Sequence, residues 1–222
     1  MRSASVAAPV ALVCLLAGCG GSSNGGGMIS VNGGVHVPAG RPTNAIATVN
    51  GSILADGYAI MKSARTVNGN ITIGAHATAE SLSTVNGAIT LQPDARVSGT
   101  VTIVNGNVTL QDGASVSGMV TNVNGIVTLY SAHVTGGIST VDADISVLGN
   151  SVVEGGITVK RPSGLFFHIS DAVPRIVIGP GAVVQGELRF RHKVALYVSD
   201  KATIGAVSGA TAVPFSGPVP PA

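Results

Sequence analysis

The sequence predicts an all-β chain that folds as a single-stranded parallel β-helix, or β-solenoid, and three observations lead to this fold class. The tripeptide Val-Asn-Gly recurs six times, and successive copies are 18 or 19 residues apart. Between the copies lie pairs of apolar side chains spaced by two residues, with turn residues separating the pairs. The composition includes 31 glycines and only 10% charged residues. A fixed period of this length is typical of stacked coils, and we expect three short strands per coil of 18–19 residues.

The first 18 residues have the features of an export signal. Arg2 precedes an apolar run from Val6 to Leu16, which is too short to span a bilayer comfortably and belongs to processing rather than to the fold. The run ends in Leu16-Ala17-Gly18-Cys19, which resembles the lipobox of bacterial lipoproteins. The resemblance implies that residues 1–18 are a lipoprotein signal peptide and that Cys19 becomes the first residue and carries the lipid.

The residue after the cysteine indicates which membrane a lipoprotein of this kind is sorted to. It is Gly20, whereas an aspartate would imply retention in the inner membrane. The resemblance therefore implies an outer-membrane lipid anchor, with the body in the periplasm or at the cell surface. An ordinary secretory signal with a chance cysteine is the competing interpretation. Residues 19–28 follow as a Gly/Ser-rich tether, because a stretch without side chains to pack behaves as flexible chain.

Residues 29–207 are predicted to form the β-helix domain, and the coil that begins at Asn86 shows the pattern. Its inward positions alternate with polar ones, as expected for strands with one buried face: Ile89, Leu91, Ala95, Val97, Val101 and Ile103. The turn residues Gln92-Pro93-Asp94 and Ser98-Gly99 separate the three pairs. Each coil therefore corresponds to one triangular rung, and the inward side chains of successive rungs stack into a continuous core.

The Asn-Gly pair is expected at one corner of every rung, because both residues tolerate the left-handed backbone region. Stacked asparagines can hydrogen-bond from rung to rung, and the predicted ladder comprises Asn32, Asn50, Asn68, Asn86, Asn105 and Asn124. Asp142 and Ala143 occupy the next copy, so the ladder should stop near residue 142 while the coil continues. A neighbouring hydroxyl stack is expected from Thr48, Thr66, Thr84 and Thr140. Antiparallel hairpins with Asn-Gly turns are the alternative fold.

The repeat weakens after residue 142 but continues to about residue 207. Residues 160–175 depart most from the rhythm, and we expect an irregular rung there with a strand from Leu165 to Ile169. Residues 208–222 are a Pro-rich tail that has too few backbone donors for a strand, so we expect it to be extended or disordered.

Two stretches of the body resemble known bacterial families. The Ile-Gly, Ala-x-Val, Gly rhythm of residues 176–205 resembles bactofilins, which are polymer-forming cytoskeletal β-helix proteins. The Thr-Val-Asn-Gly-x-Ile-Thr-Leu repeats of residues 48–129 resemble the putative-adhesin β-solenoid domains of exported bacterial proteins. The first resemblance implies self-association and the second implies adhesion. Bactofilins are typically cytoplasmic and lack a lipobox, so the chain departs from them in compartment.

Basic residues gather near the C-terminal end of the predicted solenoid. Leu188 and Phe190 are expected to point inward, which sends Arg189, Arg191 and Lys193 outward as one stripe. Such a stripe suits phosphate-rich lipid headgroups or an acidic polymer. A solvated face that discourages aggregation at a solenoid end is the competing interpretation. The formal net charge of +2 is too small to indicate nucleic acid.

The sequence offers no catalytic constellation. The histidines are scattered, at His36, His76, His133, His168 and His192. Asp142 and Asp144 share a strand face with Glu154 nearby, but a hard cation needs six or more oxygens, so no metal is expected. Capping or solvated aspartates are the simpler interpretation. Acyltransferases and polysaccharide lyases also use β-helices, so an enzyme of either kind is the third hypothesis.

The first hypothesis is a non-enzymatic, membrane-anchored envelope lipoprotein that acts as a structural or assembly β-solenoid without a cofactor. Its expected partners are the membrane, through the lipidated N-terminus, and either further copies of itself or envelope polymers, but not nucleic acid. The second hypothesis is an adhesin or glycan-binding module. Few aromatic side chains, at 3% of the chain, argue against sugar stacking.

Overall fold

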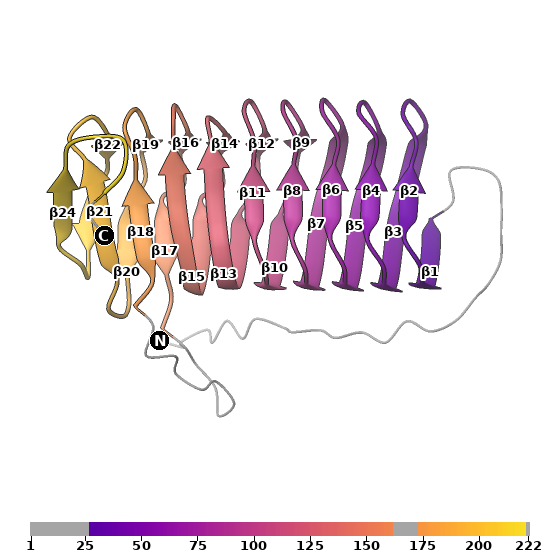
Figure 1. The fold of residues 1–222 in the computed structure, drawn as a ribbon, viewed down its shortest axis with the longest axis horizontal. Helices are drawn as coiled ribbons and strands as arrows, with labels where there is room; N and C mark the ends of the chain where they lie inside the picture. The colour runs from indigo at the N-terminus through magenta and orange to yellow at the C-terminus, as the bar shows by residue number, and fades with distance from the viewer. Residues whose placement is uncertain (1–26, 162–172, 221–222) are drawn as a thin grey trace, which may run out of the picture.

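The protein is a β-solenoid, and the strand pairs of its described residues are all parallel. The computed structural model describes residues 27–161 and 173–220. These residues form 24 strands and no helix, stacked side by side along the long axis of the molecule (Figure 1). Strands of successive coils pair in parallel register, with Asn50 opposite Asn68 and Asn68 opposite Asn86. Parallel pairing confirms the predicted stack of coils and excludes the alternative of Asn-Gly hairpins, whose neighbouring strands would run antiparallel.

Each coil contributes to three faces of the solenoid. The first face follows the Asn-Gly corner and contains β2 (Val35–Val37), β4 (Ile53–Ala55), β6 (Ile71–Ile73), β8 (Ile89–Leu91), β11 (Val108–Leu110), β18 (Arg175–Ile178), β21 (Ala195–Ser199) and β24 (Ala212–Phe215). The second face contains β9 (Arg96–Val97), β12 (Ser115–Val116), β14 (His133–Val134), β16 (Val152–Val153), β19 (Val183–Val184) and β22 (Thr203–Ile204). The third face leads back to the corner and contains β1 (Met28–Asn32), β10 (Val101–Asn105), β17 (Ile157–Val159), β20 (Leu188–Phe190) and β23 (Val207–Ser208).

The remaining strands are long enough to span two faces, which the prediction of three separate strands per coil missed. The strands that run from the second face to the third are β3 (Pro42–Asn50), β5 (Ile60–Asn68) and β7 (Thr78–Asn86). Those that cross the Asn-Gly corner from the third face to the first are β13 (Val120–Tyr130) and β15 (Ile138–Leu148). In the next coil after β7 the turn Ser98-Gly99 separates β9 from β10, and both of these strands pair with β7. The chain therefore passes from the second face to the third in both coils. The strand is continuous in β7, and it is interrupted in the next coil by the turn at Ser98-Gly99.

The interior is the apolar stack that the period-two pattern predicts. Leu91, Leu110 and Leu129 lie opposite one another on successive rungs of the first face, and all three are fully buried. Thr90, Thr109 and Thr128 lie between the inward positions and face outward. Parallel in-register pairing thus places like side chains against like on these successive rungs, which builds a continuous apolar core.

The C-terminal boundary of the solenoid lies later than predicted. The tail was expected from residue 208, but β24 adds a further strand that pairs with β21, with Val198 opposite Pro214. The prediction that proline prevents a strand here was wrong because β24 is the last strand of its face among the described residues. A proline on such an edge removes no ladder bond to a next strand. At the other end β1 begins at Met28, within the predicted tether.

Several predictions concern residues outside the described ranges. They are the signal peptide 1–18, the lipid attachment site Cys19, most of the tether, the strand from Leu165 to Ile169 and His168. In the described part of the chain, no helix is long and apolar enough to cross a membrane.

Candidate functional site

The Asn-Gly corner carries the asparagine ladder that the sequence predicts. The Nδ2 amide of each asparagine donates to Oδ1 of the asparagine one rung earlier, from Asn50 to Asn32 at 3.1 Å and from Asn68 to Asn50 at 2.9 Å. The same bond joins Asn86 to Asn68 at 3.0 Å, and it joins Asn105 to Asn86 and Asn124 to Asn105 at 3.1 Å. The asparagines are exposed, so one edge of the solenoid presents an unbroken row of amides to solvent.

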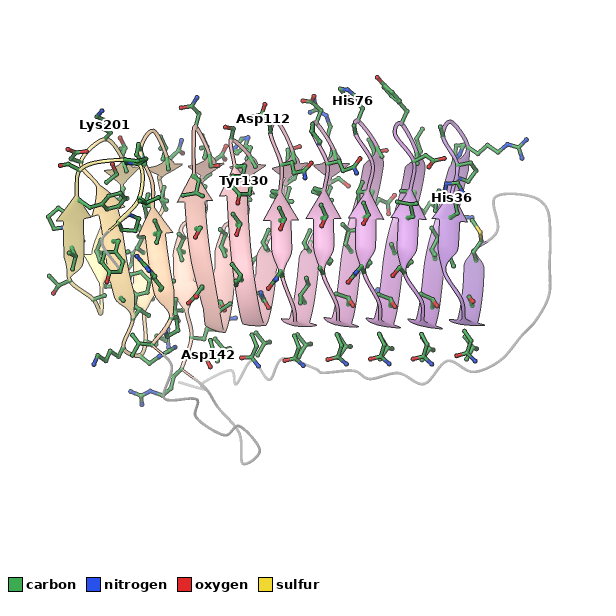
Figure 2. The ribbon with its side chains drawn as sticks, viewed as in Figure 1. His36, His76, Asp112, Tyr130, Asp142 and Lys201 are labelled. Carbon is green, nitrogen blue, oxygen red and sulfur yellow. The ribbon has the colours of Figure 1, made fainter. Side chains whose placement is uncertain are left out.

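The ladder stops where predicted. Asp142 lies opposite Asn124, and the strand pairing continues past it from Gly125 and Ala143 onward. A carboxylate has no N–H to donate to the Oδ1 of Asn124, so the donor pattern cannot be extended. Asp142 lies at the lower edge of the molecule, whereas His76, Asp112 and Lys201 lie along the upper edge (Figure 2).

Glycine follows each asparagine because the backbones of neighbouring rungs approach closely at this corner. A Cβ on Gly69 would overlap the carbonyl oxygen of Gly51, and a Cβ on Gly87 would overlap that of Gly69. Gly87 has a φ of +154°, but Gly69 has no φ in the left-handed region. The predicted reason, tolerance of positive φ, therefore applies at only some rungs, whereas the close approach applies at both.

The threonines before the corner do not form the predicted hydroxyl stack. Instead, Thr66 Oγ1 donates to the carbonyl of Gly51 on the preceding rung at 2.9 Å, and Thr84 donates to that of Gly69 at 3.1 Å. Asn122 occupies the equivalent position in a later rung and donates to Gly106 at 3.0 Å. Thr140 accepts from the N–H of Ala143 at 3.0 Å. These side chains are buried, and the bonds that they form go to the backbone of the corner rather than to each other. The side-chain oxygen of Asn122 has no hydrogen-bond partner in the described part of the chain.

Removing a central asparagine is expected to destabilise the protein more than removing the first one. Asn86 bonds to two neighbouring asparagines, whereas Asn32 bonds to one. Because the corner is exposed, Asn86→Ala should lower the free energy of unfolding by about 1 kcal/mol, and Asn32→Ala by about half of that. Denaturant unfolding followed by circular dichroism measures both values. A larger loss for Asn32→Ala would contradict the ladder's contribution.

The opposite corner carries a second row that sequence reasoning missed. Tyr58, His76 and Asp94 occupy the left-handed region, with φ of 62°, 58° and 59°, at equivalent turns of three successive rungs. The rings of Tyr58 and His76 stack with centroids 4.9 Å apart, and His76 Nδ1 lies 3.8 Å from an Asp94 oxygen. Tyr58, His76 and Asp94 are 18 residues apart, the same step as in the asparagine ladder, and this spacing could have predicted that they stack.

Two of the other described histidines each meet one carboxylate, whereas His192 Nε2 lies 2.7 Å from the carbonyl oxygen of Val141. His36 Nε2 lies 2.8 Å from Asp56 Oδ1, and His133 Nε2 lies 2.6 Å from Glu154 Oε1. Asp144 accepts the backbone N–H of Arg175 at 2.7 Å. Asp144 and Glu154 therefore have separate partners rather than a common site. Within residues 27–161 and 173–220, no three His, Cys, Asp or Glu side chains are grouped so as to hold a metal ion.

The residues of the predicted basic stripe lie on and just after β20, with Arg189 on the strand and Arg191 and Lys193 beyond its end. Leu188 and Phe190 are buried, and Arg189, Arg191 and Lys193 are exposed, as expected. Arg189 Nη2 donates to Glu187 Oε2 at 2.5 Å, and this bond lowers the pKa of Glu187 and raises the pKa of Arg189. The structure adds Arg161, which the prediction did not include, because Arg161, Arg189 and Arg191 line one shallow hollow.

No family model, curated protein or solved structure matches this chain. The resemblances to lipoproteins, bactofilins and putative adhesins therefore remain predictions from the residues quoted for them.

Proposed function

We propose that the protein is a non-enzymatic lipoprotein of the bacterial envelope, anchored in the outer membrane, that acts as a structural or assembly β-solenoid in the periplasm or at the cell surface. The observation that carries the proposal is the order of three segments. A lipobox-like Leu16-Ala17-Gly18-Cys19 precedes a Gly/Ser segment, which leads into a rod of stacked coils. This order suits a rigid body held close to a membrane by a flexible tether.

The first rung supports a role in assembly. Among the described residues, β1 pairs only with β3, so the backbone groups on its other edge have no strand partner. Ile29 and Val31 on this strand are 63% and 46% exposed. An unpaired parallel edge with apolar side chains can accept another strand. Self-association through this end is therefore part of the proposal.

Replacing Cys19 tests the anchor. In a bacterial host fed radiolabelled palmitate, the wild-type chain should incorporate label and sediment with the membranes. Cys19→Ser should do neither and should keep its signal segment, because serine has no thiol to acylate. Cys14→Ser is the matched control and should be labelled like the wild type, since Cys14 lies in the segment to be removed. Label in Cys19→Ser would contradict the proposal.

Adhesion or glycan binding is the second candidate, and the first face favours it. Thr72, Thr90, Thr109 and Thr128 form an outward hydroxyl row, and this row lies on the face that begins at the asparagine ladder. The hydroxyl and amide groups of these rows are uncharged and evenly spaced hydrogen-bond donors and acceptors, which suits binding of a neutral polymer such as a glycan. Electron microscopy would separate the candidates by revealing filaments or defined oligomers, whereas a glycan array would reveal sugar binding.

A further inference from the structure

The C-terminal end of the third face brings together cations from two neighbouring coils. Strands β17 and β20 lie side by side (Figure 1) and pair with Thr158 opposite Arg189 and Val159 opposite Phe190. The N–H of Arg191 donates to the carbonyl of Val159 at 2.9 Å. This register places Arg191 beside Lys160, with Arg161 next to them. We call Lys160, Arg161, Arg189 and Arg191 the basic end.

Three arginines of the basic end lie around one open hollow on the surface. Arg161, Arg189 and Arg191 line a shallow hollow. Phe190, which lies between Arg189 and Arg191, is buried in the core, and so is Val159, which pairs with it on the neighbouring strand. Packing therefore holds the backbone of β20 beneath Arg189 and Arg191. A planar guanidinium presents parallel N–H donors that match the oxygens of a phosphate group.

Glu187 is the acidic side chain in contact with this cluster. It binds Arg189 through both carboxylate oxygens, at 2.5 and 3.3 Å, and accepts the Ser208 hydroxyl at 2.7 Å. Glu187 thus offsets the charge of Arg189 and fixes its orientation. Among the described residues, no carboxylate forms an ion pair with Lys160, Arg161 or Arg191, so the basic end retains a positive excess.

The rest of the third face is almost uncharged, so the cations are concentrated rather than spread along the rod. The positions that are in register with Arg189 on earlier rungs are Ile29, Ala47, Arg65, Ser83, Thr102, Thr121, Ser139 and Thr158, of which Ser139 is buried. Arg65 is the one charged residue in this set. Its register neighbours Ala47 and Ser83 are neutral, which makes Arg65 a matched control for an isolated arginine on the same face.

We propose that the basic end is a binding site for phosphate groups, with Arg161 and Arg191 as the principal donors and Arg189 held in place by Glu187. The phosphate can be a free anion or the headgroup of a phospholipid, because both present the same tetrahedral oxygens. The site does not depend on the lipid anchor or on self-association, so it extends beyond the proposed function.

Phosphate titration and vesicle binding test the site in the full-length chain. Inorganic phosphate should shift the backbone amide signals of Lys160, Arg161 and Arg191 in nuclear magnetic resonance spectra. The double variant Arg161→Gln/Arg191→Gln should weaken phosphate binding at least tenfold, whereas Arg65→Gln should change it less than twofold. All three positions are exposed, so circular dichroism should show unchanged folding. Higher ionic strength should weaken binding, because exposed charges are screened.

The vesicle experiment distinguishes the two sources of phosphate. Co-sedimentation with phosphatidylglycerol vesicles but not with phosphatidylcholine vesicles, lost in the double variant, would assign the site to anionic headgroups. Phosphate-induced shifts without such co-sedimentation would assign it to a free phosphate. The proposal is overturned if the wild type shows neither effect, or if the double variant binds as well as the wild type.

Discussion

Gly69→Ala is expected to lower the free energy of unfolding by about 3 kcal/mol or more. This effect and that of Leu110→Ala are the two largest that we predict for single substitutions. The added Cβ would overlap the carbonyl oxygen of Gly51 on the preceding rung, and that atom belongs to the backbone and cannot rotate away. Relief requires the two rungs to separate, which weakens the ladder bonds on both sides of the corner. Overpacking that forces backbone shifts typically costs about 1–3 kcal/mol and occasionally more, and a clash with backbone rather than with a flexible side chain puts this variant at the upper end.

Gly40→Ala is the control that separates close approach from backbone conformation. Gly40 has a φ of +73°, but a Cβ placed on it meets no atom within 4 Å. Alanine there should lower the free energy of unfolding by only about 1 kcal/mol, from strain in the left-handed region alone. Denaturant unfolding of both variants measures the difference. A loss for Gly69→Ala no larger than that for Gly40→Ala would contradict close approach of the rungs as the reason for glycine at the Asn-Gly corner.

Leu110→Ala should lower the free energy of unfolding by roughly 2–5 kcal/mol, because it opens a cavity in the middle of the apolar stack. Leu110 is fully buried between Leu91 and Leu129 of the adjacent rungs. These neighbours are fixed by their own ladder bonds, so they cannot collapse far into the space.

The neighbouring position provides the matched control. Thr109 lies on the same strand and in the same rung but points outward between Thr90 and Thr128. Thr109→Ala should change the free energy of unfolding by no more than about 0.5 kcal/mol, as is usual for surface positions. Thermal unfolding by calorimetry would compare the two variants. A large loss for Thr109→Ala with a small loss for Leu110→Ala would contradict the inward and outward assignment of this strand.

The sequence alone determined the features that repeat with the rungs. When identical residues recur at a fixed step, parallel in-register stacking must place them against one another. This reasoning predicted the ladder from Asn32 to Asn124, its end at Asp142 and the buried stack through Leu91 and Leu110. It failed for Thr66, because periodicity specifies which residues are neighbours but not which acceptor a hydroxyl selects.

Only the tertiary structure decided the features where the period breaks. Thr140 pairs with Val159, and Ile145 pairs with Ile176, so the chain between Val159 and Ile176 is longer than the chain between Thr140 and Ile145 on the preceding rung. Because of these additional residues, the number of residues between two positions no longer shows whether they lie on neighbouring rungs. The sequence therefore could not place Arg161 in the hollow that it shares with Arg189 and Arg191. Strand β24 was missed for a related reason. Whether Pro214 is tolerated depends on the free edge of the last coil, which is a property of the stack and not of the local sequence.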